Sequence, residues 1–427
     1  MLGDQERRGS FDLEAGEALT KEVMLVCGAL VLEQVLSEEG GSSERSCECG
    51  SEFVDRKRSE KTLLTVVGPV RLARWSQRCR GCGKWRVLAD ESLDVVGTGF
   101  SPGVRRMMAG TGAALCFAKS AEMIAQLAGL RVTAKEVERV AEAVGSEVAA
   151  REEAKTAAAL RGEGESGPAA VATLYLAADG TGVPVLRRET EGRKGKGEDG
   201  IARTREAKLG AVFTSSAVDD EGRPVRDPGS TTYVGKIENV DQFGERLYAE
   251  ADRRGLNQAK QVVGLGDGAP WVWGLFDFHF PGAVQIVDFY HAAEHLSGIA
   301  RLLHPDEEAQ RKAWFQTARK KLKRGRVAEI IAEVKSAPGR GKKKEEMEKA
   351  LAYFEKNRER MRYDRFRKQG LFIGSGVVEA GCKSVIGARL KQSGMHWSVR
   401  GANAIIALRC CLESGGFEDY WESRRAA

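Results

Sequence analysis

The order of hydrophobic patterns along the chain predicts a multidomain α/β protein, in which a helical insertion interrupts a mixed β-sheet. Five short β-type runs lie between residues 171 and 291. A helical pattern of about eighty residues follows His291, and Glu379 then opens a last helix, with Ser375 as its expected N-cap. The chain has 427 residues, of which 42% are hydrophobic, so it can form more than one hydrophobic core.

Changes in composition divide the chain into seven parts. Helical periodicity covers Leu19 to Leu36, and the turn-forming sequence GGSSERSCECG then ends it. We expect an N-terminal helical segment (1–44), a zinc-ribbon-like unit (45–95), a helical unit that could bind DNA (96–160) and a linker (161–170). The first part of the core (171–295), a basic helical insertion (296–370) and the C-terminal part of the core (371–427) follow.

The β-type runs have the lengths and residue types of strands. They are VATLYLAAD, AKLGAVFTSSAVD, TTYVGKI, KQVVGLGD and AVQIVDFYH. Between the first two, EGRKGKGEDGIARTRE is too polar and too rich in glycine to pack, so we expect a mobile loop or a flap that contacts substrate.

The helical unit before the sheet has the layout of a helix-turn-helix. Ser120 and Thr133 are positioned as N-caps, and two short helices are expected around Gly129. The second helix of such a pair can enter the major groove of DNA. Two packed helices with a glycine turn are also common in helical domains, so both interpretations stay open.

Four cysteines indicate a zinc site. TLLTVV and VRLARWSQRC, joined at Gly68-Pro69, predict a hairpin that presents Cys79 and Cys82 near Cys47 and Cys49. Four thiolates suit tetrahedral zinc, although the single residue between Cys47 and Cys49 is one fewer than usual and predicts strain or a vacant position. Ordinary reduced cysteines are the alternative. The other cysteines lie in apolar or small-residue contexts that favour packing: Cys27, Cys116, Cys382, Cys410 and Cys411.

Three acidic residues, Asp179, Asp267 and Glu379, each lie at the end of an apolar run. Burial of a carboxylate is costly without a partner, so three such groups suggest a shared cation site, and oxygen ligands favour magnesium or manganese. Alternatively, the two Asp-Gly pairs only form turns and Glu379 pairs with Lys383 one helical turn later. Rival acids lie in polar or turn segments: Asp199, Asp219 and Asp220.

Basic charge is concentrated in one segment. Residues 301–370 contain 22 Lys or Arg against 11 Asp or Glu, a net charge of +11, whereas the whole chain has +6. This segment is a candidate surface for a polyanion such as nucleic acid, and a solvated helix face is the plainer alternative.

No segment predicts a membrane or secretory role. The longest apolar stretch, Val23 to Leu32, is too short to span a bilayer, and the N-terminal residues do not form a signal peptide. We therefore expect a cytoplasmic location with reduced thiols and no membrane partner.

Several stretches carry a family resemblance. YLAADGTGVP, TREAKLGAVF, GLGDGAPWVW, IVDFYHAAEHL and GLFIGSGVVEAGCKSVIGARLKQSGMHW resemble a bacterial insertion-sequence transposase of the ISKra type, over roughly residues 45 to 425. That family belongs to the RNase H-like DDE transposases with a helical insertion. The resemblance implies an RNase H-like mixed sheet, preceded by a zinc-ribbon-like unit and a helical DNA-binding unit.

The resemblance also implies an activity. Asp179, Asp267 and Glu379 would be catalytic and would hold two Mg²⁺ or Mn²⁺ ions, with zinc as a structural ion. The protein would cleave DNA at the ends of an insertion sequence and join the 3′-hydroxyl ends to target DNA. The expected partners are DNA and further copies of the chain, with no small-molecule substrate, in the nucleoid of a bacterium.

Further residues have implied auxiliary roles. Asp288 and His291 match an Asp-x-x-His element of related transposases and would orient DNA or support the metal site, although His291 could be structural or share a separate zinc site with His295. Arg389 and Lys391 follow Glu379 and could contact phosphates, or could be ordinary helix charges. Aromatic residues that could stack on a base, or simply pack in the core, are Trp271, Trp273 and Trp397.

Two rival functions remain open from the sequence. One is a transposase-derived protein that binds DNA without catalysis. The other is an RNase H-like nuclease that only hydrolyses.

Overall fold

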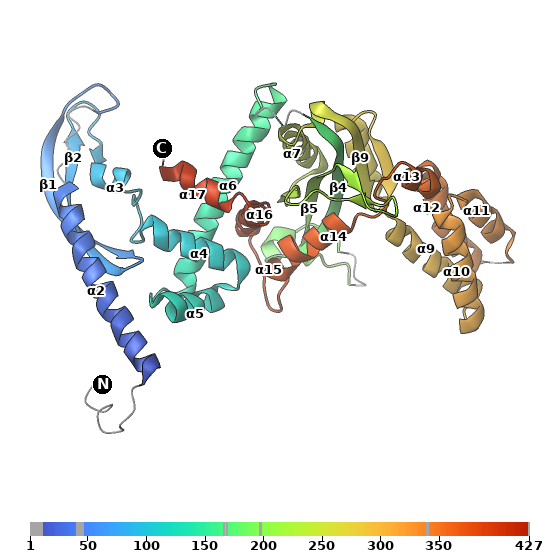
Figure 1. Ribbon diagram of the computed structural model, residues 1–427, viewed down its shortest axis with the longest axis horizontal. Coiled ribbons are helices and arrows are strands. Elements are labelled where there is room, and N and C mark those ends of the chain that lie inside the picture. The colour runs from blue at the N-terminus through green and yellow to red at the C-terminus, as the bar shows by residue number, and fades with distance from the viewer. Residues whose placement is uncertain are drawn as a thin grey trace. The chain divides into compact units, whose positions relative to one another are not determined.

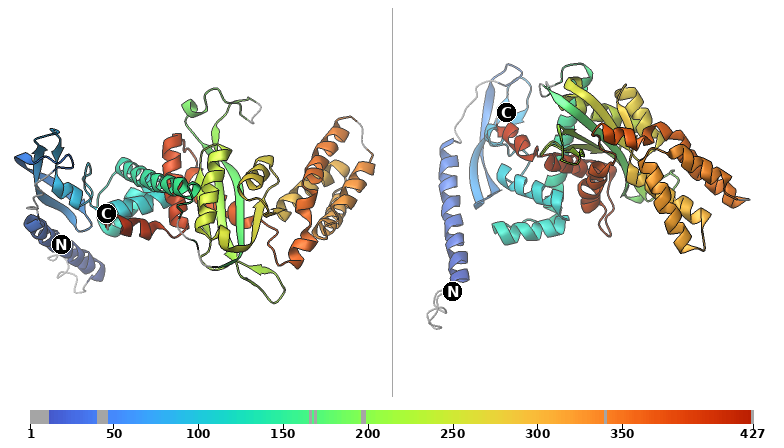
Figure 2. Two further views of the ribbon diagram at one scale, coloured as in Figure 1. Left: turned by 90° about the horizontal axis from the view of Figure 1, so that it is seen from above. Right: turned by 45° about the vertical axis from the view of Figure 1, so that its right-hand side comes forward.

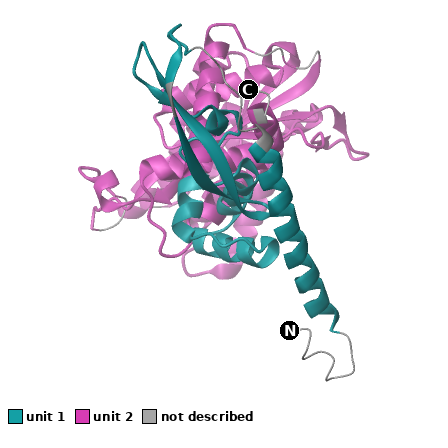
Figure 3. Cartoon of the chain, turned by 90° about the vertical axis from the view of Figure 1, so that its left-hand side faces the viewer, with its two compact units in different colours: residues 1–141 teal, residues 142–427 magenta. Residues whose placement is uncertain are grey.

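The computed structural model of the chain describes residues 12–39, 47–164, 167, 170–195, 199–338 and 341–425, without the side chains of residues 38, 39, 55, 56 and 425. It contains two compact units, residues 1–141 and residues 142–427, which Figure 3 shows in two colours. The boundary falls within α6 (Ala134–Leu160).

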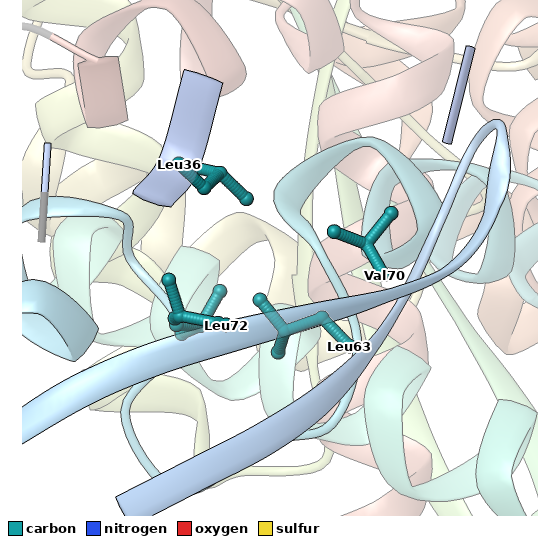
Figure 4. Packing of buried hydrophobic residues seen from close by; sticks show 5 residues of the cluster. Leu36, Leu63, Val70 and Leu72 are labelled. Carbon is teal, nitrogen blue, oxygen red and sulfur yellow. The ribbon is translucent and has the colours of Figure 1, made fainter. Parts of the chain in front are cut away.

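The first unit begins with a long helix that packs on a β-hairpin. Helix α2 covers Leu13–Glu39, and the hairpin consists of β1 (Phe53–Thr65) and β2 (Gly68–Cys79), followed by β3 (Trp85–Arg86) and α3 (Leu88–Ser92). A small apolar cluster holds helix and hairpin together, and four of its members are labelled in Figure 4: Leu36, Leu63, Val70 and Leu72, with Val95 as the fifth.

The predicted hairpin is present, but its turn differs from the expectation. Thr65 pairs with Gly68, so Val66 and Val67 form the turn and Gly68-Pro69 already belongs to β2. Gly68 has a φ of +110°, which only glycine adopts readily, and this explains why a glycine follows the turn.

Three helices complete the first unit and extend into the second: α4 (Pro102–Ala114), α5 (Phe117–Ala128) and α6. Gly129 ends α5 in the left-handed conformation, and Thr133 and Glu136 form a reciprocal capping box at the start of α6. The N-cap expected at Ser120 is wrong, because Ser120 is buried inside α5, 2.6 Å from the Thr111 hydroxyl. With 27 residues, α6 is not the short helix we expected.

The five predicted β-type runs form one mixed sheet in the second unit. The strand order is β10 (Val284–Val287), β9 (Ala259–Gly266), β4 (Val171–Pro184), β5 (Thr204–Ser215) and β8 (Thr232–Lys236). Strands β4, β9 and β10 are parallel, whereas β5 is antiparallel to both β4 and β8. Both kinds of pairing occur in the same sheet, so the predicted mixed α/β architecture is confirmed.

Helices cover the two faces of this sheet. On one face, Gly210 lies against Leu247 of α7 (Val240–Arg253) and Gly264 against Phe276 of α8 (Pro270–His279). On the other face, Leu209 lies against Gly381 of α14 (Gly376–Gly381). The chain continues on that side through a π-helical turn, η5 (Cys382–Gly387), then α15 (Ala388–Leu390) and α16 (Val399–Glu413). Glu379 therefore does not open the last helix, since α16 and α17 (Phe417–Arg425) follow it.

The predicted helical insertion is present beyond β10. It consists of α9 (Phe289–Leu303), α10 (Glu308–Lys323), α11 (Val327–Ser336), α12 (Lys342–Lys356), η4 (Arg358–Met361) and α13 (Tyr363–Lys368). Figure 1 and Figure 2 show these helices gathered as one group beside the sheet. Among the described residues, no helix is long and apolar enough to cross a membrane.

The polar segments between the strands are partly ordered. A short helix, η2 (Arg187–Thr190), precedes the expected loop. Residues of the loop form a bridge between Lys194 and Ile201 and the start of β5, while residues 196–198 lie outside the described residues. The hairpin of β6 (Ala217–Val218) and β7 (Pro224–Val225) carries Asp219 in its turn, as expected. The remaining short element is η3 (Leu256–Gln258).

Candidate functional site

Asp179 and Asp267 meet where the parallel pairing of β4 with β9 ends. Ala177 of β4 is the register partner of Leu265 of β9, and each acid follows two residues later, Asp179 within β4 and Asp267 just after the end of β9. The two carboxylates interact electrostatically. Ligands of open α/β sheets bind at this end of the strands.

The environment of Asp179 opposes its ionisation. Burial raises the pKa of Asp179, whereas the Gly180 N–H at 2.7 Å and the Cys382 thiol lower it, and the charge of Asp267 raises it further. Burial and the charge of Asp179 also raise the pKa of Cys382, so this thiol stays protonated and donates to the carboxylate. A divalent ion bound between Asp179 and Asp267 would offset both the burial of Asp179 and the repulsion between the two carboxylates.

Asp267 is held by its own turn and by the helical insertion. Its Oδ1 accepts a hydrogen bond from the Ala269 N–H at 2.8 Å, and the hydroxyl of Tyr353 in α12 donates to its backbone oxygen at 2.8 Å. Gly268 has a φ of +102° and faces the Tyr353 ring, which a Cβ atom would meet at 2.4 Å. The Asp-Gly pair does form a turn, and the same turn fixes the carboxylate beside Asp179.

Glu379 lies on the helix that reaches Asp179. Cys382, which contacts Asp179, follows Glu379 by three residues, so Glu379 lies about one helical turn before this contact. The Glu379 carboxylate accepts a hydrogen bond from Lys383 at 2.6 Å, and its side chain is 57% exposed. The structure thus brings the helix to Asp179 and also contains the Glu379–Lys383 pair that we considered as the alternative.

Asp288 fixes two helices at the same end of the sheet. It is the buried N-cap of α9, where it accepts a hydrogen bond from the His291 N–H at 2.7 Å. It also accepts hydrogen bonds from the N–H and the hydroxyl of Ser375, which occupies the N-cap position of α14. Because its hydroxyl binds Asp288, Ser375 does not cap α14 with its side chain, and this differs from our expectation.

The two histidines of α9 have different surroundings. His291 is partly exposed, and its Nδ1 lies 3.6 Å from Oε2 of Glu294. It is near enough to Asp179 for its charge to lower the pKa of that carboxyl group. The ring of His295 stacks on Tyr353, with 3.8 Å between centroids, and burial lowers the pKa of His295. His291 therefore faces the acidic pair, whereas His295 packs against the insertion.

Of the two residues predicted to contact phosphates, Lys391 is exposed and Arg389 is buried. Lys391 donates to the Thr181 hydroxyl, two residues along β4 from Asp179 and on the same face. Arg389 is fully buried, and its guanidinium lies 5.0 Å from the centroid of Trp397. In this conformation, only Lys391 presents a charge that a phosphate could reach.

The tryptophans do not present faces for base stacking. Trp397 is buried and its indole N–H donates to Leu390, and Trp273 is also buried. Trp271 is half-buried on the α7 side of the sheet, between Phe243 and the ammonium of Lys208. The structure agrees with core packing, which was the alternative for each tryptophan.

The four cysteines of the first unit form a compact cluster. Cys47 and Cys82 are 3.8 Å apart between sulfur atoms, and Cys49 and Cys79 are 3.3 Å apart. All four sulfur atoms lie within 4.8 Å of one another, so the cluster could bind a metal such as zinc. The short spacing between Cys47 and Cys49 does not prevent this convergence.

Local hydrogen bonds prepare this cluster for a cation. Two hydrogen bonds to Cys49 lower its pKa to about 6: the one from the Ser51 N–H has the larger effect, and the one from the Cys79 side chain adds to it. This pKa favours the thiolate form of Cys49 at neutral pH. The N–H of Cys49 lowers the pKa of Cys47, but burial and the neighbouring thiols raise it to about 11. A bound metal would favour the thiolate form of every member.

The two candidate metal sites differ in how closely their donors converge. Among the described residues, the cysteines are the one group of three or more donors found within 4.8 Å of one another. Asp179, Asp267 and Glu379 are therefore more widely spaced, with Glu379 turned toward Lys383. Their donor chemistry still fits a hard divalent cation, because all three supply carboxylate oxygen.

Two residues of this site were missed by the sequence analysis. Cys382 looked like a packing residue, although its position one turn after Glu379 was an available signal. Tyr353 gave no signal, because it lies 86 residues after Asp267 and meets it only through the packing of α12.

The fold and site thus define an α/β protein with two neighbouring carboxylates where the central strands β4 and β9 part, and with a tetracysteine cluster. Residues 9–424 match the uncharacterised protein family UPF0236, so the chain belongs to this family. No curated protein matches the sequence.

Proposed function

We propose that this protein is a metal-dependent DDE transposase, which cleaves DNA at the ends of an insertion sequence and joins the 3′-hydroxyl ends to target DNA. One observation carries the proposal: Asp179 and Asp267 lie side by side, and the helix that contacts Asp179 through Cys382 carries Glu379 one turn earlier. An acid from each of two parallel strands and a third from a helix is the arrangement that the family resemblance implies.

The sheet topology supports an RNase H-like core. Its first three strands, β4, β5 and β8, are antiparallel neighbours, and β9 and β10 then add in parallel on the other side of β4. The order 3-2-1-4-5, counted along the chain, agrees with an RNase H-like sheet. The helical insertion lies between the second and third acids, as in the related transposases.

The chain's own residues divide the work at the proposed site. Asp179, Asp267 and Glu379 would hold the Mg²⁺ or Mn²⁺ ions, which would neutralise charge at the phosphodiester and activate the attacking oxygen. The Asp267 turn and Tyr353 keep one carboxylate in place, and Asp288 fixes the start of α14. Lys383 is exposed and can release Glu379, because ion pairs at the surface are weak. His291 and Lys391 line the approach to Asp179 and can contact phosphate.

The other parts of the chain would handle DNA. The tetracysteine cluster would hold structural zinc in a ribbon-like unit, and α5 with α6 would recognise the element ends. The basic helices between residues 301 and 370 would hold the duplex by its phosphates. Joining two ends would require several copies of the chain in one complex. The protein would act on DNA in the bacterial nucleoid.

The test uses the purified protein, Mg²⁺ and a plasmid that contains the gene with its flanking DNA. We expect 3′ ends released at fixed positions beside the gene and recovered, by sequencing, as strands joined to new DNA. Asp267→Asn should lower product formation by at least about 1000-fold, because it removes one cation ligand. Asp220→Asn is the matched control, since Asp220 is an exposed acid on the β6–β7 hairpin.

The products also separate the rival functions. Cleaved but never joined strands would indicate a nuclease that only hydrolyses. The Glu379–Lys383 ion pair favours the second rival, a DNA-binding protein without catalysis. In that case, the wild type and Asp267→Asn would bind DNA equally and neither would yield cleaved strands.

A further inference from the structure

Helix α2 is apolar on two opposite faces, and only one of them is covered within its unit. One face packs on the hairpin through Ala29, Leu32 and Leu36, and Gly28 approaches Val67. Figure 1 shows α2 lying along β2 on this side. The opposite face carries large side chains that are between 37% and 68% exposed: Leu19, Val23, Met24, Val26, Leu30, Val31 and Val35.

We call this exposed face the α2 stripe. At about 100° per residue, its members cover roughly half of the helix circumference, over about five helical turns, and Thr20 and Gln34 lie on the same face toward its ends. Cys27 is exposed and lies at the centre of the stripe, both along the helix and around it. Between residues 23 and 32 the helix is apolar on all sides, and such a segment is normally buried on all sides, so the stripe requires a second surface.

We infer that the α2 stripe is a homodimer interface, in which two copies of the chain pair their α2 helices in antiparallel orientation about a twofold axis near Cys27. Nothing in this inference depends on the proposed DNA chemistry.

The chemistry of the stripe favours a second copy as its occupant. Residues 23–32 contain no charged residue, so two copies can face each other without burying a charge. The sequences 1–11 and 40–46 are mostly polar or charged and offer little apolar surface of their own. The glutamates of α2 outnumber its single basic residue, Lys21, so the charge of the helix disfavours an acidic partner.

The area is sufficient for a specific pair. Seven large apolar side chains, each about half exposed, offer on the order of 550 Å² per chain, so a dimer would bury about 1,100 Å², above the roughly 1,000 Å² of a specific interface. Isologous pairing uses the same patch on both copies, as twofold symmetry requires.

The charge of Glu17 at the start of the stripe favours one orientation. With the axis at Cys27, an antiparallel pair places Glu17 opposite Ser37. A parallel pair would place Glu17 opposite the same residue of the second copy, where like charges repel. Antiparallel helices also align their dipoles favourably.

Cys27 provides the first test. Mild oxidation of the full-length protein with copper phenanthroline should link two chains, because two Cys27 thiols lose two protons and two electrons to the oxidant and form one disulfide. Cys27→Ser should abolish this linked dimer on a non-reducing gel. A wild-type protein that stays monomeric, with Cys27 slow to react with iodoacetamide, would show that the same chain covers the stripe and would overturn the inference.

Mixed cysteine variants test the orientation. On the Cys27→Ser background, chains with Leu19→Cys should cross-link to chains with Val35→Cys, while neither variant should cross-link to itself. The reverse pattern would overturn the antiparallel arrangement.

Charged substitutions test the interface without oxidation. Val23→Glu with Val31→Glu should raise the dimer dissociation constant at least about 100-fold in analytical ultracentrifugation, because four charges would enter an apolar seam. Both valines are exposed, so circular dichroism should be unchanged. The matched control is Val54→Glu with Val96→Glu, two exposed valines of the same unit outside α2. Equal dissociation constants for the two double variants would place the interface elsewhere and contradict the inference.

Discussion

Burial makes the ionised form of Asp179 unfavourable. Because its pKa in the folded state is raised, Asp179 favours folding below the pKa of the unfolded chain and loses this contribution as pH rises through the folded pKa. Asp179→Asn removes the charge, so we expect the melting temperature in EDTA to rise by about 2 °C or more at pH 8 and to change little at pH 4.

Scanning calorimetry in EDTA and in Mn²⁺ measures this effect. Mn²⁺ should stabilise the wild type and leave the Asn variant unchanged. Asp199→Asn is the control, since Asp199 is exposed and bonded to Arg203. Equal responses of wild type and Asp179→Asn to Mn²⁺ would contradict a cation site at Asp179.

Tyr353 acts on Asp267 through a single hydrogen bond. Tyr353→Phe keeps the ring on His295 and removes only the donor to the Asp267 backbone oxygen. Groups that hold metal ligands in place typically change affinity by 10-fold to 100-fold, so we expect Mn²⁺ binding, measured by paramagnetic resonance, to weaken about 10-fold. Tyr420→Phe, which removes a hydrogen bond to Glu147, should have no effect.

The three acids could be selected from the sequence because each ends an apolar run, where burial of a charge is costly unless a partner or a ligand offsets it. Their supporting residues could not. Cys382 resembles any buried thiol, and Tyr353 reaches Asp267 only when α12 packs beside β9. Arg389 shows the opposite error, because a basic residue after Glu379 suggested a phosphate contact and the fold buries it beside Trp397.

Asp288 binds the first residues of two helices, α9 and α14, so its removal should destabilise both helices. Asp288→Ala removes the N-cap of α9 and leaves the buried Ser375 hydroxyl without its acceptor. We expect a loss of about 2–4 kcal/mol in the free energy of unfolding, measured with urea. Ser375→Ala should cost about 1 kcal/mol, because it removes one hydrogen bond and keeps the cap. Equal losses in the two variants would show that Asp288 does not stabilise α9 separately.

The tetracysteine cluster should determine the stability of the hairpin that carries it. The apolar cluster between α2 and this hairpin contains only five buried residues, so a metal would contribute strongly. We expect about one zinc ion per chain by plasma mass spectrometry and a separate, low-temperature unfolding transition after chelation. Cys79→Ser should reproduce the chelated state, and Cys116→Ser, outside the cluster, should not.

The sequence predicted helices and strands correctly where the hydrophobic pattern was long. The predictions of turns and caps were wrong where tertiary contacts determine the local conformation. All five strands of the sheet follow from their runs. In contrast, Val66 and Val67 occupy the hairpin turn because the register of β1 and β2 is set along thirteen residues of β1, not by Gly68-Pro69. Ser120 has the chemistry of a cap, but the α5 helix begins before it and buries it against Thr111.

At the scale of the molecule, charge is concentrated on the helical insertion. Lys320 and Lys323 of α10 are exposed and are candidates to bind DNA phosphates. The double variant Lys320→Gln with Lys323→Gln should therefore show a smaller slope of log affinity against log salt concentration. The slope should fall by about one for each phosphate that is no longer neutralised. Fluorescence anisotropy between 50 and 200 mM salt, about the usual range for such plots, measures the slope. Lys155→Gln with Lys260→Gln is the control, because both lysines lie outside the insertion and Lys260 is the second residue of β9, at the amino end of the parallel strands. Equal slopes for both pairs would contradict DNA binding by the insertion.

The central claim is that Asp179, Asp267 and Glu379 share divalent cations. The most direct measurement is anomalous diffraction from a Mn²⁺-soaked crystal of the full chain. We expect manganese peaks between Asp179 and Asp267, two of them about 3.5 to 4 Å apart when both positions fill, with Glu379 turned from Lys383 toward them. Absence of manganese at these carboxylates, with Glu379 still paired to Lys383 at 2.6 Å, would contradict the account.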